Sequence, residues 1–220
     1  MIPSRDQFTV REWRLVQTLT TPLKVQRWLN RVPYNTERAG EMQQSFRSVV
    51  RTGTAHCMEA AMFAATVLEQ HGYPPIVMSI ESKDWLDHVV FLYREKDGWG
   101  AIGRSRDPGL HGRKPAYHSP RHVALSYVEA YVDYTGRVRA YGVVNLDDAL
   151  PGYDWRFSRR NLWKVEQLLI DLPHSRIRTS DAKFRALRAR YVAHRERYGD
   201  KPWRYFKGRE RWAPLPGEFK

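Results

Sequence analysis

The sequence predicts an α+β fold in which a central helix packs against an antiparallel sheet, with additional helices before and after this core. Three observations support the prediction. Residues 55–70 are rich in alanine, methionine and leucine, which are strong helix formers. Three short segments rich in β-branched and aromatic residues follow closely. The chain has 220 residues, 42% of them hydrophobic and 13% aromatic, and is long enough to bury a sizeable core.

The first part of the chain predicts three helices. Apolar residues recur near helical spacing at residues 9–19. Residues 21–29 open with a threonine and a proline, the pattern of an N-cap followed by a first-turn proline. A third helical segment covers about residues 39–50 and stops before Gly53, because glycine is a frequent helix stop.

The central helix, residues 55–70, is expected to be buried. Thr54 is a suitable N-cap for it, and the glycine and two prolines within residues 71–75 end it. Strands are predicted at residues 76–80, 88–93 and 99–102, the last two joined by a tight turn. The sequence therefore predicts an antiparallel meander behind the helix.

The second half of the chain is less regular. Residues 104–119 are rich in arginine, glycine, proline and histidine and predict a surface loop that borders a cleft. A helix at 119–131, a short strand near 138–144 and helices at 158–172 and 181–198 follow. In the last helix an apolar stripe recurs every three or four residues and is predicted to pack on the core. Its members are Phe184, Leu187, Tyr191 and His194.

Most of the net charge of +13 belongs to the last third of the chain. Residues 155–220 contain 18 lysines and arginines against 7 aspartates and glutamates. Such a basic end suits an anionic partner such as nucleic acid, a membrane surface or an acidic protein, although a solvated helical face is the simpler interpretation. Residues 201–207 interleave aromatic and basic side chains, which in a nucleic-acid binder combine stacking with phosphate contact.

These patterns predict a single domain over residues 1–220, with its core at about 40–110 and a basic helical extension at about 155–220. Cys57 is the only cysteine, so the chain cannot form an internal disulfide and a reducing compartment fits best. Neither an export signal nor a long apolar run is visible. We therefore expect a soluble, cytoplasmic protein without a membrane span, and we expect no cofactor.

Cys57 and His88 are the candidate catalytic residues. Cys57 lies at the start of the central helix, where free N–H groups and the helix dipole favour a thiolate and can stabilise an oxyanion. His88 begins an apolar strand, an odd place for an imidazole without a partner. The simpler interpretations are a cysteine that fills the core and a structural histidine.

The sequence around these positions resembles the transglutaminase-like branch of the papain-type cysteine fold. The matching segments are residues 54–61 (TAHCMEAA), 72–77 (GYPPIV), 87–90 (DHVV) and 98–102 (GWGAI), in the order that the family has them. The resemblance covers about residues 40–110. It implies that Cys57 is the nucleophile, His88 is the general base, and a thioester is the intermediate.

The third catalytic residue is where the sequence departs from this family. The resemblance implies an aspartate after the tryptophan-bearing strand, but Gly103 occupies that point. Asp107 is our prediction for the residue that orients His88, with Ser105 as the alternative and a solvated loop aspartate as the simpler interpretation. Gln43 and Gln44 are candidates for a side-chain donor to the oxyanion hole.

The resemblance implies a cysteine-dependent acyl transferase acting on an amide: a peptidase, an amidase or a transglutaminase with a protein or peptide substrate. Three other interpretations remain open. The first is an inactive domain of this fold that binds protein or nucleic acid through its cleft or basic end. The glycine at position 103, in place of the expected aspartate, favours this interpretation. A nucleic-acid-associated protein would use Cys57 as core filler. A zinc site would combine His56, Cys57, Asp87 and His88, although no regular ligand spacing supports it.

Overall fold

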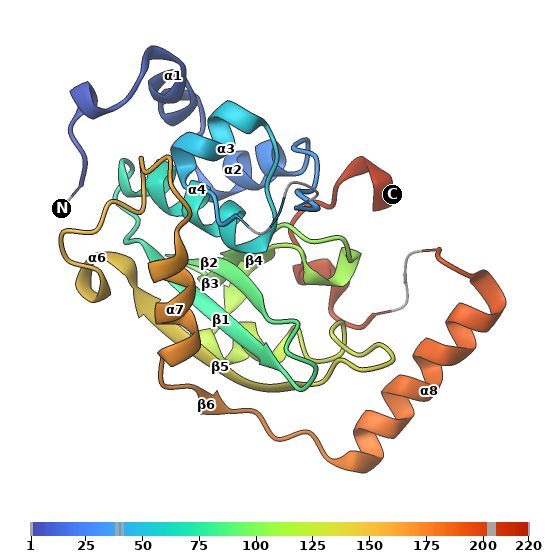
Figure 1. Ribbon diagram of the computed structural model, residues 1–220. Coiled ribbons are helices and arrows are strands. Elements are labelled where there is room, and N and C mark those ends of the chain that lie inside the picture. Colours follow the sequence, from blue (N-terminus) through green and yellow to red (C-terminus); the bar gives the residue numbers. More distant parts are fainter. Residues whose placement is uncertain (1, 38–39, 41, 202–205, 220) are drawn as a thin grey trace.

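The computed structural model describes residues 2–37, 40, 42–201 and 206–219. Within them the protein is a mixed α+β fold around a six-stranded antiparallel sheet of order β4-β3-β2-β1-β5-β6 (Figure 1). The strands are β1 (Ile76–Ser82), β2 (His88–Glu95), β3 (Gly98–Ile102), β4 (Arg113–Tyr117), β5 (Val138–Asn145) and β6 (Ser175–Arg176). The helices are α1 (Val10–Thr18), α2 (Pro22–Leu29), α3 (Phe46–Thr52), α4 (Cys57–Glu69), α5 (Pro120–Leu125), α6 (Leu146–Ala149), α7 (Trp163–Asp171) and α8 (Asp181–Tyr198).

Side-chain alternation along the strands divides the core into two layers. Val77 on β1 and its partner Phe91 on β2 point to one face of the sheet, where they pack with α4 and α7. Their neighbours Met78 and Leu92 point to the opposite face and pack with α5. Both faces of the central strands are therefore covered, which explains why these strands are almost continuously apolar.

Helix α4 is the central helix that the sequence predicts, and twelve of its thirteen residues are buried. It packs mainly on β2, and Phe63 on α4 stacks on Trp28 of α2 at a ring distance of 4.2 Å. The predicted N-cap was wrong, however. His56, not Thr54, caps the helix: its Nδ1 accepts from Met58 N–H, and Glu59 accepts from His56 N–H. Cys57 is consequently the first residue of α4.

Two predicted segments differ in the structure. Helix α3 covers residues 46–52 rather than 39–50, because Ser45 caps it by accepting from Ser48 N–H. Residues 104–119 are not a surface loop: they contain strand β4 and a buried arginine, Arg113. The Arg113 guanidinium donates to the carbonyls of Gly109 and His111 and stacks on Tyr127, so its hydrogen-bonding capacity is met without an acid.

Helix α8 is present as predicted, but its apolar stripe is not part of the core. Leu187 is its one buried residue, while Phe184, Tyr191 and His194 are only half-buried. The arginines of α8 are mostly exposed, and an anionic partner for this helix stays a prediction. The predicted aromatic and basic tail falls largely on residues 202–205, outside the described part of the chain. None of the described helices is long and apolar enough to cross a membrane.

Candidate active site

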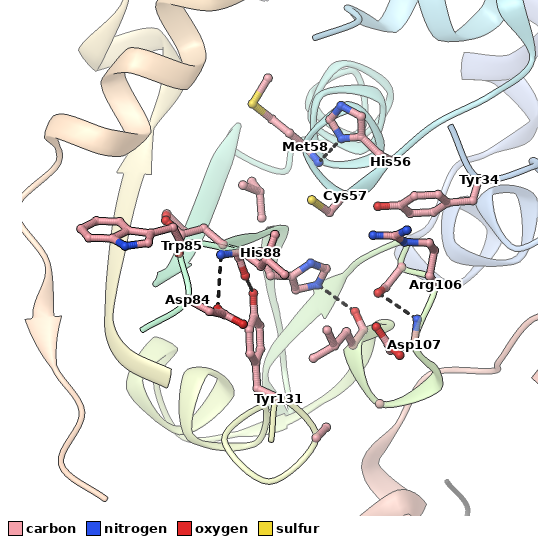
Figure 2. Close-up of a pocket in the computed structure, with 18 of the residues that line it drawn as sticks. Tyr34, His56, Cys57, Met58, Asp84, Trp85, His88, Arg106, Asp107 and Tyr131 are labelled. Atoms are coloured by element: carbon pink, nitrogen blue, oxygen red, sulfur yellow. Dashed lines mark hydrogen bonds between the residues drawn. The ribbon is translucent and has the colours of Figure 1, made fainter. Parts of the chain in front are cut away.

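A pocket of about 560 Å³ opens at the N-terminal end of α4 (Figure 2). Its walls come from α4, the start of β2, the turn at residues 84–87 and the loop at 105–110. Cys57, His88 and Asp107 all line it, so the structure brings the three predicted catalytic residues to one pocket. Ser105 lines the same wall as Asp107.

Cys57 is a half-buried residue that lines this pocket. Burial raises the pKa of the thiol, while hydrogen bonds from the backbone N–H groups of Val89 and Met58 lower it without offsetting burial fully. The resting form is therefore the neutral thiol, and not the thiolate that the helix start alone suggested. A thiol of this kind needs a base to take its proton when it attacks a substrate.

His88 is buried and is held through one of its two ring nitrogens. Nε2 lies 2.8 Å from the carbonyl oxygen of Leu110, which has only lone pairs to offer, so Nε2 carries the proton and donates. Nδ1 therefore keeps the lone pair. Burial lowers the pKa of His88 to about 4, which leaves the imidazole neutral at pH 7. His88 and Cys57 share the pocket, although no hydrogen bond joins their side chains.

The backbone carbonyl of Leu110 accepts the His88 hydrogen bond that the sequence predicts for Asp107 or Ser105. Asp107 is exposed, and its N–H donates to Ser105 Oγ rather than its carboxylate reaching His88. A Cβ atom at Gly103 would lie 3.6 Å from His88 Nε2 and 3.2 Å from the Leu110 oxygen. Gly103 thus marks the place from which an aspartate would reach the imidazole, and the Leu110 carbonyl fills that place.

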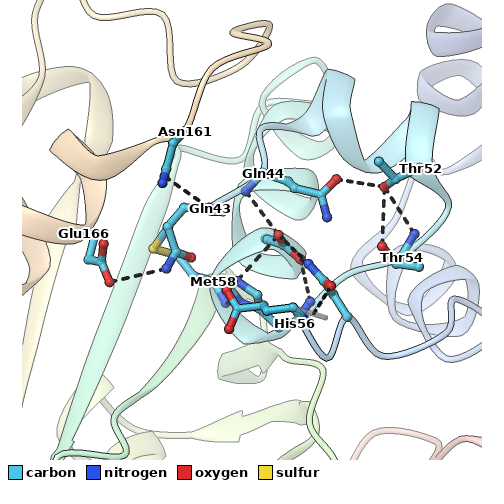
Figure 3. Close-up of polar contacts among 11 residues, drawn as sticks. Gln43, Gln44, Thr52, Thr54, His56, Met58, Asn161 and Glu166 are labelled. Atoms are coloured by element: carbon cyan, nitrogen blue, oxygen red, sulfur yellow. Dashed lines mark hydrogen bonds and ion pairs between the residues drawn. The ribbon is translucent and has the colours of Figure 1, made fainter. Parts of the chain in front are cut away.

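The two glutamines have different positions (Figure 3). Gln43 lines the pocket and donates through Nε2 to Glu166 Oε1 at 3.3 Å. Gln44 is buried, with its side-chain oxygen accepting from Thr52 Oγ1 and its backbone N–H donating to Glu59. Gln44 therefore supports the start of α4, and only Gln43 of this pair is placed to meet a substrate.

The geometry does not favour the zinc alternative. Among the described residues there is no group of three or more histidine, cysteine, aspartate or glutamate side chains that could hold a metal ion. The candidate ligands have other roles: His56 Nδ1 caps α4, His88 Nε2 binds Leu110, and Asp87 accepts from Ser82 N–H at 2.8 Å.

Three aromatic residues of the pocket were not anticipated from the sequence. Tyr34 and Tyr131 lie near Cys57, and burial raises the pKa of Tyr34 to about 12. Trp85 is 75% exposed at the pocket wall and has a positive φ of 64°, which is unusual for a bulky residue. No sequence signal could have found them, because the turns and loops that carry them have no motif of their own.

Models of known protein families and curated proteins were both compared with the chain, and nothing in either comparison matches.

Proposed function

We propose that the protein is a cysteine-dependent acyltransferase that acts on amide bonds, in a domain of the transglutaminase-like branch of the papain-type fold. The observation that carries the proposal is that one pocket holds both a half-buried cysteine at a helix start and a neutral imidazole whose Nε2–H donates to the Leu110 carbonyl. That hydrogen bond leaves Nδ1 as a base.

The proposed reaction runs through a thioester. As Cys57 Sγ attacks the amide carbon, the thiol proton passes to His88, and the carbonyl oxygen becomes an oxyanion. The C–N bond then breaks, and the leaving amine takes the proton from His88. The N–H groups at the start of α4 are donors for the oxyanion. Water or a second amine then attacks the thioester and restores the thiol.

The test uses para-nitrophenyl acetate as an activated acyl donor and intact mass spectrometry as the readout. In this reaction a thioester bond forms on Cys57, the aryl ester bond breaks, and nitrophenolate leaves. We expect one acetyl group per chain that hydroxylamine removes. Cys57→Ala should abolish the adduct, and His88→Gln should slow its formation about a hundredfold.

A matched control for the histidine is His122→Gln, since His122 is exposed and lies outside the pocket. This variant should acetylate at the wild-type rate. Acetylation of the Cys57→Ala variant to the same extent as wild type, or a His88→Gln variant as fast as the control, would show that the thiol and imidazole do not act together. Repeating the reaction with a primary amine separates hydrolysis, which gives acetate, from transamidation, which gives the acetamide.

A further inference from the structure

The pocket is acidic in a basic protein. Six carboxylates are among its described lining residues, and Arg106 is the one lysine or arginine there. The whole chain, by contrast, has 37 lysines and arginines against 24 aspartates and glutamates. The lining carboxylates are Glu37, Asp84, Asp87, Asp107, Asp133 and Glu166.

Most of these carboxylates have no basic partner. Several acids outside the pocket pair with arginines, as Glu12 does with Arg47 and Glu69 with Arg156. Within the described residues, the pocket carboxylates of positions 84, 87, 107 and 133 form no ion pair with lysine or arginine. Three of them are fixed by uncharged donors instead: Asp84 by Thr135 Oγ1, Asp87 by Ser82 N–H and Asp133 by Gly136 N–H.

The carboxylates of the pocket are spread around the Cys57 thiol and do not form one compact cluster. The charges of Glu37 and Asp107 raise the pKa of Tyr34, while that of Arg106 lowers it. The charges of Asp84, Asp87 and Asp107 raise the pKa of Tyr131. Cys57 contributes to the pKa of both tyrosines. No three of the described groups are close enough together to hold a metal ion. The arrangement therefore suits a cation that is extended along the pocket.

An independent observation points to a second feature of the ligand. His56 lines the pocket with a side chain that is only 9% exposed. Its buried Nε2 makes no hydrogen bond, although carboxylate oxygens of Glu59 and Glu37 lie 3.5 Å and 3.7 Å away. Because Nδ1 accepts from Met58 N–H, Nε2 carries the proton and is an unused donor. A buried donor that makes no hydrogen bond is costly, and a ligand carbonyl oxygen that approaches Nε2 more closely than these carboxylates would satisfy it.

We propose that the pocket binds a cationic peptide segment, one with lysine or arginine side chains beside the acyl group that is transferred. The carboxylates attract the side chains, and His56 Nε2 donates to a peptide carbonyl. The acyl chemistry in this statement rests on the proposed function. The charge of the pocket does not rest on the proposed function, so either proposal can fail while the other stands.

The experiment measures the charge around Cys57 with three methanethiosulfonates: the cationic trimethylammonioethyl, the anionic sulfonatoethyl and the neutral methyl reagent. With each, a disulfide forms on Cys57, the reagent's sulfur–sulfur bond breaks, methanesulfinate leaves, and the thiol proton goes to solvent. Each rate is divided by that of β-mercaptoethanol with the same reagent. At low ionic strength the cationic reagent should react about tenfold faster than the anionic one, and added salt should reduce this preference.

Paired substitutions test which charges are responsible. Asp84→Asn with Asp133→Asn keeps the hydrogen-bond acceptors but removes two of the six charges, and it should clearly lower the ratio of rates. Asp148→Asn with Glu196→Gln removes two exposed charges away from the pocket and should leave the ratio unchanged. A wild-type ratio of one or below, a thiol that none of the reagents reaches, or an equal loss in the two double variants would overturn the proposal.

Peptides then test the class of ligand. An acetylated peptide that alternates lysine and glycine should protect Cys57 from the neutral reagent, and the same peptide with glutamate in place of lysine should not. Spermidine carries the charge without the carbonyls, so equal protection by spermidine would overturn the peptide part of the proposal. A charge preference without an acyl-enzyme would refute the proposed function alone, and an acyl-enzyme without a charge preference would refute this inference alone.

Discussion

Gly103 lies where a side chain would have to begin in order to reach the buried nitrogen of His88. Its backbone is fixed by Gln26, whose side-chain amide donates to the Gly103 carbonyl and accepts from its N–H. A Cβ atom added here would lie 3.1 Å from Val90 Cγ1 and 3.2 Å from the Leu110 oxygen, which is closer than usual van der Waals contact. The absence of a side chain therefore leaves room for the carbonyl that holds the imidazole.

We accordingly expect Gly103→Ala to lower the rate of Cys57 acetylation several-fold, because the added methyl group displaces the Leu110 carbonyl from His88 Nε2. Burst kinetics with para-nitrophenyl acetate measure this rate. Gly217→Ala is the control, since nothing lies within 4 Å of its Cβ position. An unchanged rate in a folded Gly103→Ala protein would mean that the Leu110 contact does not position the base.

At the scale of single residues, the sequence predicts that Cys57 and His88 share a pocket, but it does not predict what surrounds them. Cys57 is found from its place at a helix start, and His88 from its place at the end of an apolar strand. The acceptor for His88 could not be predicted, because it is a backbone atom and the identity of Leu110 carries no information about it. The sequence suggests His56 only as a metal ligand, because its capping role depends on a helix that begins two residues later than predicted.

Among the elements, α4 and α8 show how differently two long helices are stabilised. The side chains of α4 are buried on every side, which is why its alanine-rich composition alone predicts it. Helix α8 buries one side chain, and its other contacts include ion pairs such as Arg190 with Glu129. The spacing of its aromatic residues predicted the helix correctly but not its burial, since periodicity does not show whether another element covers the stripe.

This difference predicts unequal costs for truncating large side chains in the two helices. Phe63→Ala on α4 removes a fully buried ring stacked on Trp28 and should lower the free energy of unfolding by about 3–5 kcal/mol. Leu187→Ala on α8 should cost clearly less, since its surroundings can relax into solvent. Urea unfolding followed by circular dichroism measures both values, and a larger loss for Leu187→Ala would contradict this description of α8.

Across the whole molecule, buried neutral histidines couple stability to pH. Burial lowers the pKa values of His56 and His88 to about 4 and of His111 to about 3. In the unfolded chain these groups bind protons below about pH 6.5, whereas the folded protein does not bind them until the pH is much lower. The unfolded state therefore gains protons first, and the histidines make the protein less stable as the pH falls from 7 towards 4.

Buried carboxylates such as Glu59 and Glu69 act in the opposite direction, because burial raises their pKa values. The histidine contribution is therefore measured as a difference between variants. Between pH 7 and pH 5 the wild type should lose about 2 kcal/mol more stability than His111→Gln, while His122→Gln should follow the wild type. Urea unfolding at the two pH values tests this expectation, and parallel curves for wild type and His111→Gln would refute it.

The main-chain acceptor of His88 has a consequence for how tolerant this site is to change. A carboxylate that orients a histidine is lost with one substitution, but a carbonyl group belongs to every residue. Position 110 can therefore accept many side chains of similar shape without loss of the hydrogen bond to His88. Only a substitution that moves the backbone at this position should break that bond. Arg113 holds that path by binding the carbonyls on either side of Leu110, those of Gly109 and His111. In a saturation screen, the intolerant positions of this loop should thus be those that fix the course of the chain.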